Sequence, residues 1–587
     1  MKSSTLVLFL MLLFAAGLRL WGVGFGLPWI QHIDEGGLIH TALFMAAEYG
    51  RPSVYVHGTV YPGLVAMFSG LYYWLGKMLG WFFSPDDFLV WYVRDPTTLV
   101  LFGRLLDVFF SLVTVGLLFW IGKKVYGWRV GLLAALFLTV SILHVKESHY
   151  VKPDVLSGLV ALLLFEVSYR IVKRGAFTDY IWAGLLFGLA LGVKFTLLLA
   201  LPMILLAHVL RRKGRGKNIF LSLFNRHLFV FFALAVVMFF LVAPYVFIDF
   251  RFFLRDWVRF GNSLLLPRGD PHSPLWYYLF SYLKEGLGLG VWLLTILGIL
   301  VVGWRRRIED VLLVSFPFVF LATVDFWSKE HAQRYVLPIL PLFVLLSGIG
   351  GDWIVSKWRG KQLYQKLLYW IFLVIILWQP LERSIKFDFL ITKPQTGVLL
   401  TDWIEKNIPY GSTMAIDGRL RAYYPGSSGP YVYPTSADFS AELEKIPSDQ
   451  GMGRYLKAIA KSREGKGGYA ILATPNLAYV YNLEKEIYDL EGFPRLGSVD
   501  YYLGKGVEYI VTSDWSQPKF PIRYAWSEVF RNSLVEHYDL IARFEPTVRF
   551  QDEYHLVRLD YQALDQVNIF DRDAVFGSVI SLYRRKG

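Results

Sequence analysis

Long stretches of apolar residues, separated by short polar segments, dominate the chain up to about residue 380. A helix of about 20 such residues spans the ~30 Å hydrocarbon layer and satisfies its own backbone hydrogen bonds. The pattern predicts an α-helical polytopic membrane protein with about eleven transmembrane helices. The expected spans are about 5–24, 98–121, 129–145, 155–172, 180–193, 195–210, 227–247, 287–304, 310–326, 335–353 and 367–380.

Two of these stretches need a further decision. The first begins after Lys2 and is longer than a signal-peptide core, without a clear small-x-small cleavage site, so we expect a retained helix. The stretch 180–210 is too long for one span, and the basic loop 211–217 must return to the starting side. We therefore expect a break near Lys194, at the outer boundary of the membrane.

Basic clusters between the spans indicate the orientation, because Lys and Arg accumulate in cytoplasmic loops. If the apolar stretch 60–80 does not cross, all of these clusters face the cytoplasm; if it crosses, most move outside. We expect 60–80 to be a helix in the outer interface, within a first external loop of residues 25–97. The clusters are Lys123, Lys124 and Arg129; Arg170, Lys173 and Arg174; and residues 211–217, 305–307 and 357–361.

After about residue 381 the composition changes, and Gly, Pro, Ser and charged residues become more frequent. Patterns such as 'GYAILATP' and 'GVEYIVTSDW' are typical of buried strands beside helices. We predict a transmembrane module over 1–380 and a soluble α/β domain over 381–587. An odd number of spans from a cytoplasmic start places this second domain outside the cell.

Composition agrees with the membrane assignment: 55% of residues are hydrophobic and the mean hydropathy is +0.41. The net charge of +13 lies in short clusters between apolar stretches, so it indicates topology and no nucleic-acid partner. There is no cysteine, which excludes disulfides and cysteine-ligated metals.

On this topology the outer loops hold many ionisable groups at helix ends. Charges at a membrane boundary are costly unless they pair with each other or with a substrate. Carboxylates that take a proton and cations that neutralise a phosphate would suit a lipid phosphate and a hydroxyl acceptor. The groups are His32, Asp34, Glu35, His57, Lys146, Glu147, His149, Lys152, Asp154, Lys194, Asp249, Asp270, His272, Lys329, Glu330, His331 and Arg334.

Structural explanations compete for the carboxylates. Asp34 and Glu35 open the predicted helix 'DEGGLIHTALFMAAEYG', where acids complement the macrodipole. Asp154 follows a proline and is equally explained as an acid at a helix start. For His149 and Lys152, which flank Asp154, the alternative is snorkelling to the interface.

The cations and remaining histidines have alternatives too. Lys194 stands isolated between two apolar half-helices, where it needs a partner unless it snorkels. Arg334 begins a span, and its planar fork suits a phosphate or lipid headgroups. His57 and His331 are explained as hydrogen-bonding or surface residues because no metal-ligand spacing such as His-x-x-x-His occurs. No cofactor is indicated, and a divalent metal held by carboxylates and phosphate oxygens stays possible.

Four segments, in order over about 20–410, resemble the GT-C superfamily of polyprenyl-phosphate-dependent glycosyltransferases, particularly protein O-mannosyltransferases and lipid A aminoarabinose transferases. The first is 'DEG' followed by 'AEYGRPSVYVHGTVYPGL'. The second is 'GRLLDVFFSLVTVGLLFWIGKKVYG'. The third pairs 'SHYVKPDVLSGL' with 'GLALGVKFTLLLALP', and the fourth is 'RYVLPILPLF' followed by 'DWIEKNIPYGSTMAID'. No single motif is specific, but their order is.

The resemblance implies site roles by position. Asp34 matches the first-loop catalytic carboxylate, with Glu35 beside it, and Asp154 matches the second acid, which helps to position sugar or acceptor. Lys194 and Arg334 would contact the carrier phosphate. The chain has 'HGTVYPGL' where the family has 'HPPL', which weakens a role for His57; His149, Lys152 and His331 are further candidates for substrate binding.

The implied activity is inverting transfer of a sugar from a polyprenyl-phosphate donor to a hydroxyl of a protein, lipid or glycan, on the outer face of the plasma membrane. A transporter or flippase of a lipid-linked sugar is the main alternative, although transporters usually show duplicated halves and midplane charges. A non-catalytic cell-envelope scaffold is the other. Membrane lipids are expected partners in every case.

Overall fold

The computed structural model divides into two compact units. The helical unit comprises Met1–Val23, Leu38–Phe68 and Leu101–Asp388, and the mixed unit comprises Gly24–Gly37, Ser69–Val100 and Phe389–Gly587. The structure describes residues 3–28, 30, 32–55, 58–213, 225–265, 273–327, 332–357, 363–417, 470–474, 481–482, 487–488, 499–513, 530, 532–549, 563–577 and 579–587. The division of the chain at 380/381 stays a prediction.

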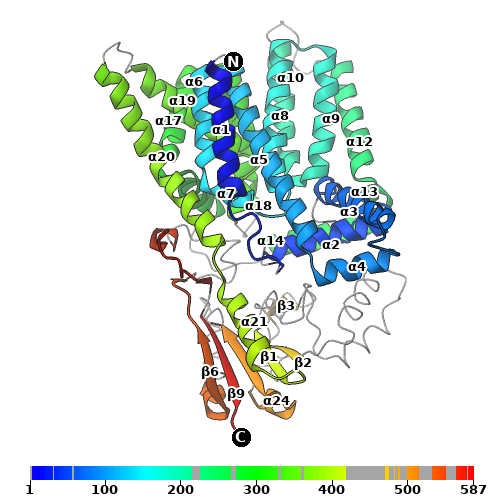
Figure 1. The fold of residues 1–587 in the computed structure, drawn as a ribbon. Helices are drawn as coiled ribbons and strands as arrows, with labels where there is room; N and C mark the ends of the chain where they lie inside the picture. The colour runs from blue at the N-terminus through cyan, green and yellow to red at the C-terminus, as the bar shows by residue number, and fades with distance from the viewer. Residues whose placement is uncertain are drawn as a thin grey trace. The chain divides into compact units, whose positions relative to one another are not determined.

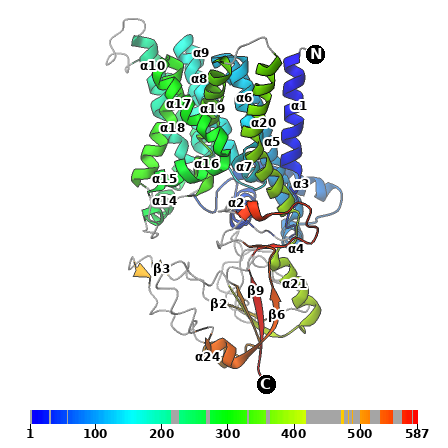
Figure 2. The same cartoon turned by 90° about the vertical axis from the view of Figure 1, so that its left-hand side faces the viewer.

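Helices of the helical unit run side by side in a bundle (Figures 1 and 2). Short helical segments, η1 (Phe195–Ala200), η2 (Tyr277–Leu283) and η3 (Gln333–Val336), connect or extend them. The α-helices are α1 (Ser3–Leu20), α5 (Thr97–Tyr126), α6 (Trp128–Val140), α7 (Ile142–Glu147), α8 (Asp154–Lys173), α9 (Phe177–Val193), α10 (Leu201–Lys213), α12 (Arg226–Val242), α13 (Pro244–Ile248), α14 (Phe250–Leu265), α15 (Pro274–Trp276), α16 (Lys284–Leu287), α17 (Leu289–Arg305), α18 (Ile308–Trp327), α19 (Leu340–Lys357) and α20 (Leu363–Ile391).

The apolar stretches predicted from the sequence form helices. Among the described residues, 4 helices are long and apolar enough to cross a membrane: Thr97–Tyr126, Asp154–Lys173, Phe195–Lys213 and Leu340–Lys357. Shorter apolar helices cover Thr5–Leu20, Trp128–Val140, Phe177–Val193, Arg226–Val242 and Leu289–Arg305. The chain is therefore an integral membrane protein, and the number of about eleven spans stays a prediction.

Two predicted spans have shifted ends. The helix expected over 335–353 begins only at Leu340, because residues Gln333–Val336 form a 3₁₀ turn and prolines follow at 338 and 341. The helix expected over 367–380 continues to Ile391 as α20. Its polar extension is held by the bundle, since Arg383 pairs with Glu285 at 2.6 Å.

The predicted break near Lys194 is confirmed. Helix α9 ends at Val193, and Lys194 takes an extended conformation, with φ −158° and ψ 124°, before η1 begins. The chain then turns back along α8 in α10, since α8 contacts both α9 and α10. The interruption places Lys194 at a helix end.

Glycines let neighbouring helices approach closely. Gly184, Gly188 and Gly192 form one row on α9, at which an added Cβ would meet atoms of α12 at 2.5, 2.3 and 2.4 Å. Helices α17 and α19 use a reciprocal pair: a Cβ at Gly298 would meet the Leu346 carbonyl, and one at Gly350 the Leu294 carbonyl. In lipid the hydrophobic effect does not drive helices together, and small residues at this spacing let them associate through close van der Waals contacts instead.

Basic loops predicted to share one side gather at one end of the helical unit. The Arg211 guanidinium donates to the main-chain carbonyls of Val172, Lys173 and Arg174, which joins the ends of α8 and α10. Lys173 pairs with Glu309 at 3.4 Å. The other end of α8 is Asp154, and its 20 residues make these two ends about 30 Å apart.

The mixed unit includes helical segments from the predicted external loop. Helix α2 (Ile33–Ala47) begins in it, α3 (Val60–Met78) ends in it, and α4 (Pro85–Arg94) lies wholly within it. The helix expected over 60–80 is thereby confirmed as α3, while its interfacial position stays a prediction. Ser84 and Asp87 form a capping box at the start of α4, whose Phe88 and Trp91 stack at 5.5 Å.

The rest of the described mixed unit is built on a five-stranded sheet in the order β2-β1-β5-β9-β6 (Figure 1). The first three strands are parallel, and β9 is antiparallel to both of its neighbours. Strands β2 and β5 are the two segments predicted as buried strands. The strands and helices are β1 (Thr413–Asp417), β2 (Ala470–Thr474), β5 (Tyr509–Ser513), β6 (Tyr538–Phe544), β9 (Ile580–Arg585), α21 (Thr396–Asn407) and α24 (Val499–Gly504).

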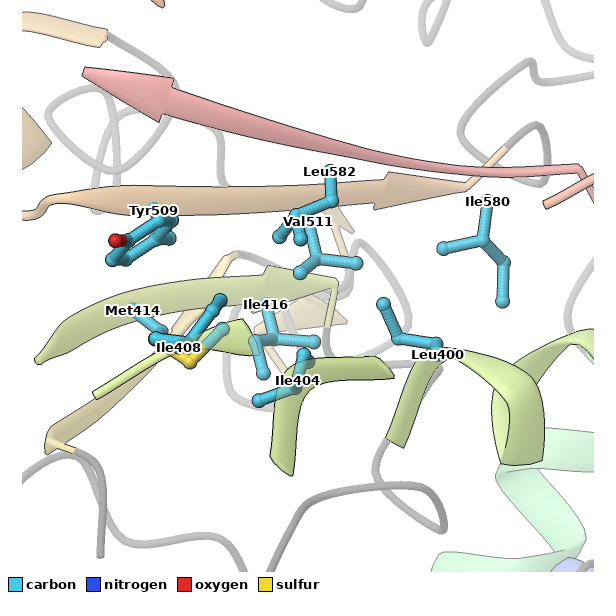
Figure 3. Close-up of a cluster of buried hydrophobic side chains, with 9 residues drawn as sticks. All are labelled: Leu400, Ile404, Ile408, Met414, Ile416, Tyr509, Val511, Ile580 and Leu582. Atoms are coloured by element: carbon cyan, nitrogen blue, oxygen red, sulfur yellow. The ribbon is translucent and has the colours of Figure 1, made fainter. Parts of the chain in front are cut away.

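Alternating side chains give this sheet two apolar faces. On one face, residues of β1, β5 and β9 pack against α21; Figure 3 shows Leu400 and Ile404 of that helix beside Ile416 and Val511. On the other face, Ile510 packs in a cluster with Tyr502 of α24. Helix and sheet together bury the α/β core, while a soluble, external location for this domain stays a prediction.

The glycine contact between α17 and α19 predicts a position-specific loss of stability. In Gly298→Ala, the new methyl would lie 2.0 Å from the Leu346 carbonyl oxygen. Overpacking of this kind costs about 1–3 kcal/mol, so we expect the thermal unfolding midpoint in detergent to fall. Gly303→Ala on the same helix meets nothing within 4 Å and should leave the midpoint unchanged or slightly raised. Equal midpoints for the two variants would contradict the close contact.

Candidate active site

Asp154 and Lys194 form a largely buried ion pair between two helix ends. Asp154 is the first residue of α8, and Lys194 follows the last residue of α9. The Lys194 Nζ lies 2.5 Å from the Asp154 Oδ1, and the two side chains are 19% and 7% exposed. An isolated charge with so little water around it would be costly, so each ion holds the other in place.

The ring of Tyr335 connects this pair to Arg334. The Lys194 Nζ lies 5.7 Å from the ring centroid, and the Arg334 Cζ lies 5.3 Å from it. Arg334 and Tyr335 both belong to the 3₁₀ turn η3, which precedes α19. The charge of Arg334 also acts on the Asp154 carboxyl. The structure therefore brings together three of the predicted site residues, Asp154, Lys194 and Arg334.

A fully buried polar network supports the η3 turn. The Lys146 Nζ donates to the Gln333 side-chain oxygen at 2.7 Å and lies 2.8 Å from the Glu147 carboxylate. Lys152 lies 3.5 Å from the same carboxylate. Because Gln333 directly precedes Arg334, the contact with Lys146 fixes the turn that carries the guanidinium.

Asp107 extends the network into α5. Its Oδ2 accepts the main-chain N–H of Lys152 at 3.0 Å and the hydroxyl of Tyr61. Asp107 and Tyr61 are fully buried, and Lys152 is 1% exposed. The ammonium of Lys152 also lies 4.8 Å from the Tyr150 ring. Lys152, a predicted substrate contact, is thus part of the packing behind the Asp154 pair.

His149 is fully buried, and both of its ring nitrogens face main-chain carbonyls. Nδ1 lies 2.9 Å from the Val145 oxygen and Nε2 lies 3.0 Å from the Trp21 oxygen. Burial lowers the pKa of His149 to about 4, which keeps the ring neutral. These contacts fit a structural role for His149 better than substrate binding.

Asp34 and Glu35 lie in the mixed unit, in the first turn of α2, as the sequence predicts. The His32 Nδ1 accepts the main-chain N–H of Asp34 at 3.1 Å, which caps the helix start. Glu35 is buried, whereas Asp34 is partly exposed. Of the two acids, only Asp34 is accessible to solvent. Its approach to Asp154 stays a prediction.

The other candidates lie outside the described residues. These are His57 and His331, together with Asp270, His272, Lys329 and Glu330. Within the part of the chain that the structure describes, no three His, Asp or Glu side chains lie close enough together to hold a metal ion. A divalent metal held jointly by carboxylates and substrate phosphates stays a prediction.

Sequence reasoning missed Asp107, Gln333 and Tyr335 as members of this cluster. Asp107 had a usable signal, because it interrupts the otherwise apolar 'LLDVFF' of a long membrane helix. Gln333 and Tyr335 had none, since a glutamine and a tyrosine at a helix start are ordinary. Lys146 and Glu147 were noted among the outer ionisable groups but given no role.

Comparison with known proteins places this geometry in context. The family model described as Dolichyl-phosphate-mannose-protein mannosyltransferase matches residues 100–246, which contain Asp107, Asp154 and Lys194. The archaeal oligosaccharyltransferase from Archaeoglobus fulgidus, solved with an inhibitory peptide and a dolichol-phosphate, superposes with a TM-score of 0.50. That match has 12% identity and covers 93% of this chain and 73% of the other.

The chain has a GT-C fold. Two relatives by sequence are undecaprenyl phosphate-α-4-amino-4-deoxy-L-arabinose arabinosyl transferases. The enzyme from Edwardsiella ictaluri is 28% identical over 296 residues, 47% of this chain and 48% of the relative. The one from Serratia proteamaculans is 23% identical over 311 residues, 49% of this chain and 50% of the relative. This chain thus spans about half the length of these relatives. The resemblance to polyprenyl-phosphate-dependent glycosyltransferases predicted from the sequence motifs is confirmed.

The burial of the Asp154–Lys194 pair predicts a measurable energetic coupling. In a double-mutant cycle with Asp154→Asn and Lys194→Gln, we expect a coupling free energy of unfolding of about 1–3 kcal/mol, because each single change strands a buried charge. The pair Lys173–Glu309, at 3.4 Å and with side chains 48% and 15% exposed, is the control and should couple by about 0–1 kcal/mol. Equal coupling in the two cycles would show that Asp154 and Lys194 are not paired in the folded protein.

Proposed function

We propose that this chain is a membrane glycosyltransferase that moves a sugar from a polyprenyl-phosphate carrier to a hydroxyl acceptor. The observation that carries the proposal is the meeting of Lys194 and Arg334 on the Tyr335 ring, beside the Asp154 carboxylate. Two cations from separate helix ends, at the boundary of an apolar bundle, suit the phosphate of a lipid whose tail lies between helices.

The proposed reaction is a single displacement at the anomeric carbon. The acceptor oxygen attacks that carbon, the bond from carbon to the phosphate oxygen breaks, and its electron pair leaves with the polyprenyl phosphate. The acceptor proton passes to the Asp34 carboxylate, and the sugar configuration inverts. A carboxylate of ordinary pKa is a weak base, so most of the rate comes from positioning and from neutralising the leaving phosphate.

Each residue then has a distinct role. Lys194 and Arg334 bind the phosphate and stabilise the charge that it gains as it leaves. Asp154 orients the Lys194 ammonium through their ion pair and assists in placing sugar or acceptor. Gln333 accepts a hydrogen bond from Lys146, and this contact holds the η3 turn that carries Arg334 in place. Asp34 is the catalytic carboxylate, with Glu35 behind it at the start of α2.

The names of similar proteins support the carrier more than the sugar. The arabinosyl transferases are named for undecaprenyl phosphate, the family model for dolichyl phosphate, and the archaeal oligosaccharyltransferase was solved with dolichol-phosphate. The sugars in these names differ, being an aminodeoxyarabinose in one and mannose in another. The shared chemistry is a phosphate on a polyprenyl chain, so we assign that donor class and a protein, lipid or glycan acceptor.

The proposed site faces the extracytoplasmic side of the plasma membrane. Basic residues at the ends of α8 and α10 meet at one end of the helical unit, and Asp154 lies at the other end of α8. If the positive-inside rule assigns the basic end to the cytoplasm, the site opens outside. The C-terminal α/β domain is then extracytoplasmic, with about eleven spans before it.

Asp34→Asn should abolish transfer while leaving the protein folded, because the amide cannot accept the acceptor proton. The assay follows a labelled polyprenyl-phosphate sugar with purified, reconstituted protein. Asp86→Asn makes the same change at an exposed acid in the first turn of α4 and should keep full activity. Full activity in Asp34→Asn would remove this residue from the mechanism.

Lys194→Gln and Arg334→Gln should raise the KM for the carrier-linked donor by about tenfold or more, since each removes a charge-assisted contact to phosphate. Lys173→Gln at the opposite end of α8 is the control.

In the same assay an enzyme consumes the donor, a flippase moves it across the bilayer unchanged, and a scaffold does neither. Donor that is moved but not consumed would replace our proposal by transport.

A further inference from the structure

Helix α14 carries two parallel rows of exposed side chains of opposite character. Arg251, Arg255 and Arg259 recur at every fourth residue and are all exposed. Phe250, Leu254 and Val258, each one position earlier, are 55%, 49% and 54% exposed. At 3.6 residues per turn these two rows lie on adjacent faces of the helix. An arginine row thus borders an apolar row along the described side chains of α14.

A third face of α14 packs against neighbouring residues, which fixes the rotation of the helix about its own axis. The ring centroids of Phe253 and Trp257 lie 5.7 and 5.1 Å from that of Phe195, which directly follows the break at Lys194. The Asp256 carboxylate accepts the main-chain N–H of Tyr55 at 3.3 Å. Because this face is packed, the helix cannot roll to bury the apolar row, and Phe250, Leu254 and Val258 stay on the surface.

The apolar row continues a larger exposed apolar surface. Helix α12 contacts α13, and α13 contacts α14. Near the end of α12, Phe240 and Leu241 are 47% and 67% exposed, and Phe247 and Ile248 of α13 are 42% and 64% exposed. Helix α12 is apolar and lies within one of the spans expected from the sequence, so exposed apolar side chains at its end suit contact with acyl chains. The row on α14 extends that surface beyond the end of the span.

We propose that α14 lies in the bilayer interface and binds the headgroups of anionic phospholipids through Arg251, Arg255 and Arg259. The apolar row enters the acyl boundary, and the adjacent guanidiniums reach the phosphates, to which they donate paired hydrogen bonds. Nearby acids leave this row largely available: Asp249 is held by Arg51 at 2.6 Å and Tyr55 at 2.8 Å. Arg255 contacts Asp256 at 3.2 Å, but its side chain is 60% exposed.

The chain has no cysteine, so one label site can be introduced without other changes. Leu254→Cys would be labelled with a fluorophore in nanodiscs that contain phosphatidylglycerol and phosphatidylcholine. In separate samples, the phosphatidylglycerol or the phosphatidylcholine carries a quencher on its acyl chain. We expect quenching by both, with the phosphatidylglycerol form more effective by about twofold or more, because the basic row enriches anionic lipid beside the label.

The ratio of the two quenching efficiencies tests the arginines. It should fall to about 1 in R251Q/R255Q/R259Q and be kept in R251K/R255K/R259K, since charge is retained. Lys123→Gln/Arg306→Gln/Arg307→Gln removes the same charge from exposed residues elsewhere and should keep the ratio. Gel filtration checks that each variant is folded. If the triple glutamine variant fails to fold, the single variants R251Q, R255Q and R259Q carry the test, and each should lower the ratio.

Three results would overturn the proposal. Quenching of the label by iodide in water, with none by lipid, would place α14 outside the interface. An unchanged ratio in the glutamine variant would show insertion without headgroup recognition. A raised KM for the polyprenyl-phosphate donor with an unchanged ratio would place the arginine row at the carrier phosphate instead.

Discussion

An ammonium ion among apolar helices is stable only while an anion holds it, and in this chain that constraint falls on Lys194. Its carboxylate partner, Asp154, begins the preceding helix of the hairpin. To make the contact, α9 must stop at Val193 and the chain must turn at Lys194. The same ammonium lies 5.7 Å from the centroid of the Tyr335 ring, and Tyr335 belongs with Arg334 to the turn that Lys146 holds through Gln333.

Behind the pair, the site is organised by contacts that have little to do with substrate. Lys146, Glu147, Lys152 and Asp107 are essentially buried and compensate one another. Such a network costs desolvation, and its value lies in defining one arrangement of the surrounding helices. A phosphate that arrived at Lys194 and Arg334 would therefore meet donors already in place, which is the condition for electrostatic stabilisation without reorganisation.

Much of the fold was predictable because the bilayer sets the length of membrane helices. In addition, a strand that is covered on both faces appears in the sequence as a short, continuous apolar run. The apolar stretches, the break at Lys194, and strands β2 and β5 were predicted on those grounds. Helix α20 ran past its predicted end because its polar extension is stabilised by Glu285, a residue far away in the sequence. Local pattern carries no information about such a partner.

The candidate site was predictable only where a charge stood out against apolar neighbours, as at Lys194, or where an ordered motif resembled a family. Asp154 and Arg334 owed much to that resemblance. Gln333 and Tyr335 are ordinary residue types whose importance comes from neighbours 187 and 141 positions earlier in the chain, at Lys146 and Lys194. His149 looked like a substrate contact because sequence shows proximity to Asp154 but not the carbonyls of Val145 and Trp21 that surround its ring.

The ion pair forms within the hairpin of α8 and α9. Asp154 is the first residue of α8, Lys194 directly follows α9, and the two are 40 positions apart. During synthesis this hairpin is complete before η3 leaves the ribosome, so the lysine can enter the membrane already neutralised. The order of residues along the chain thereby spares the insertion machinery an unpaired Lys194. Biogenesis and the later binding of an anionic lipid would then depend on one and the same carboxylate.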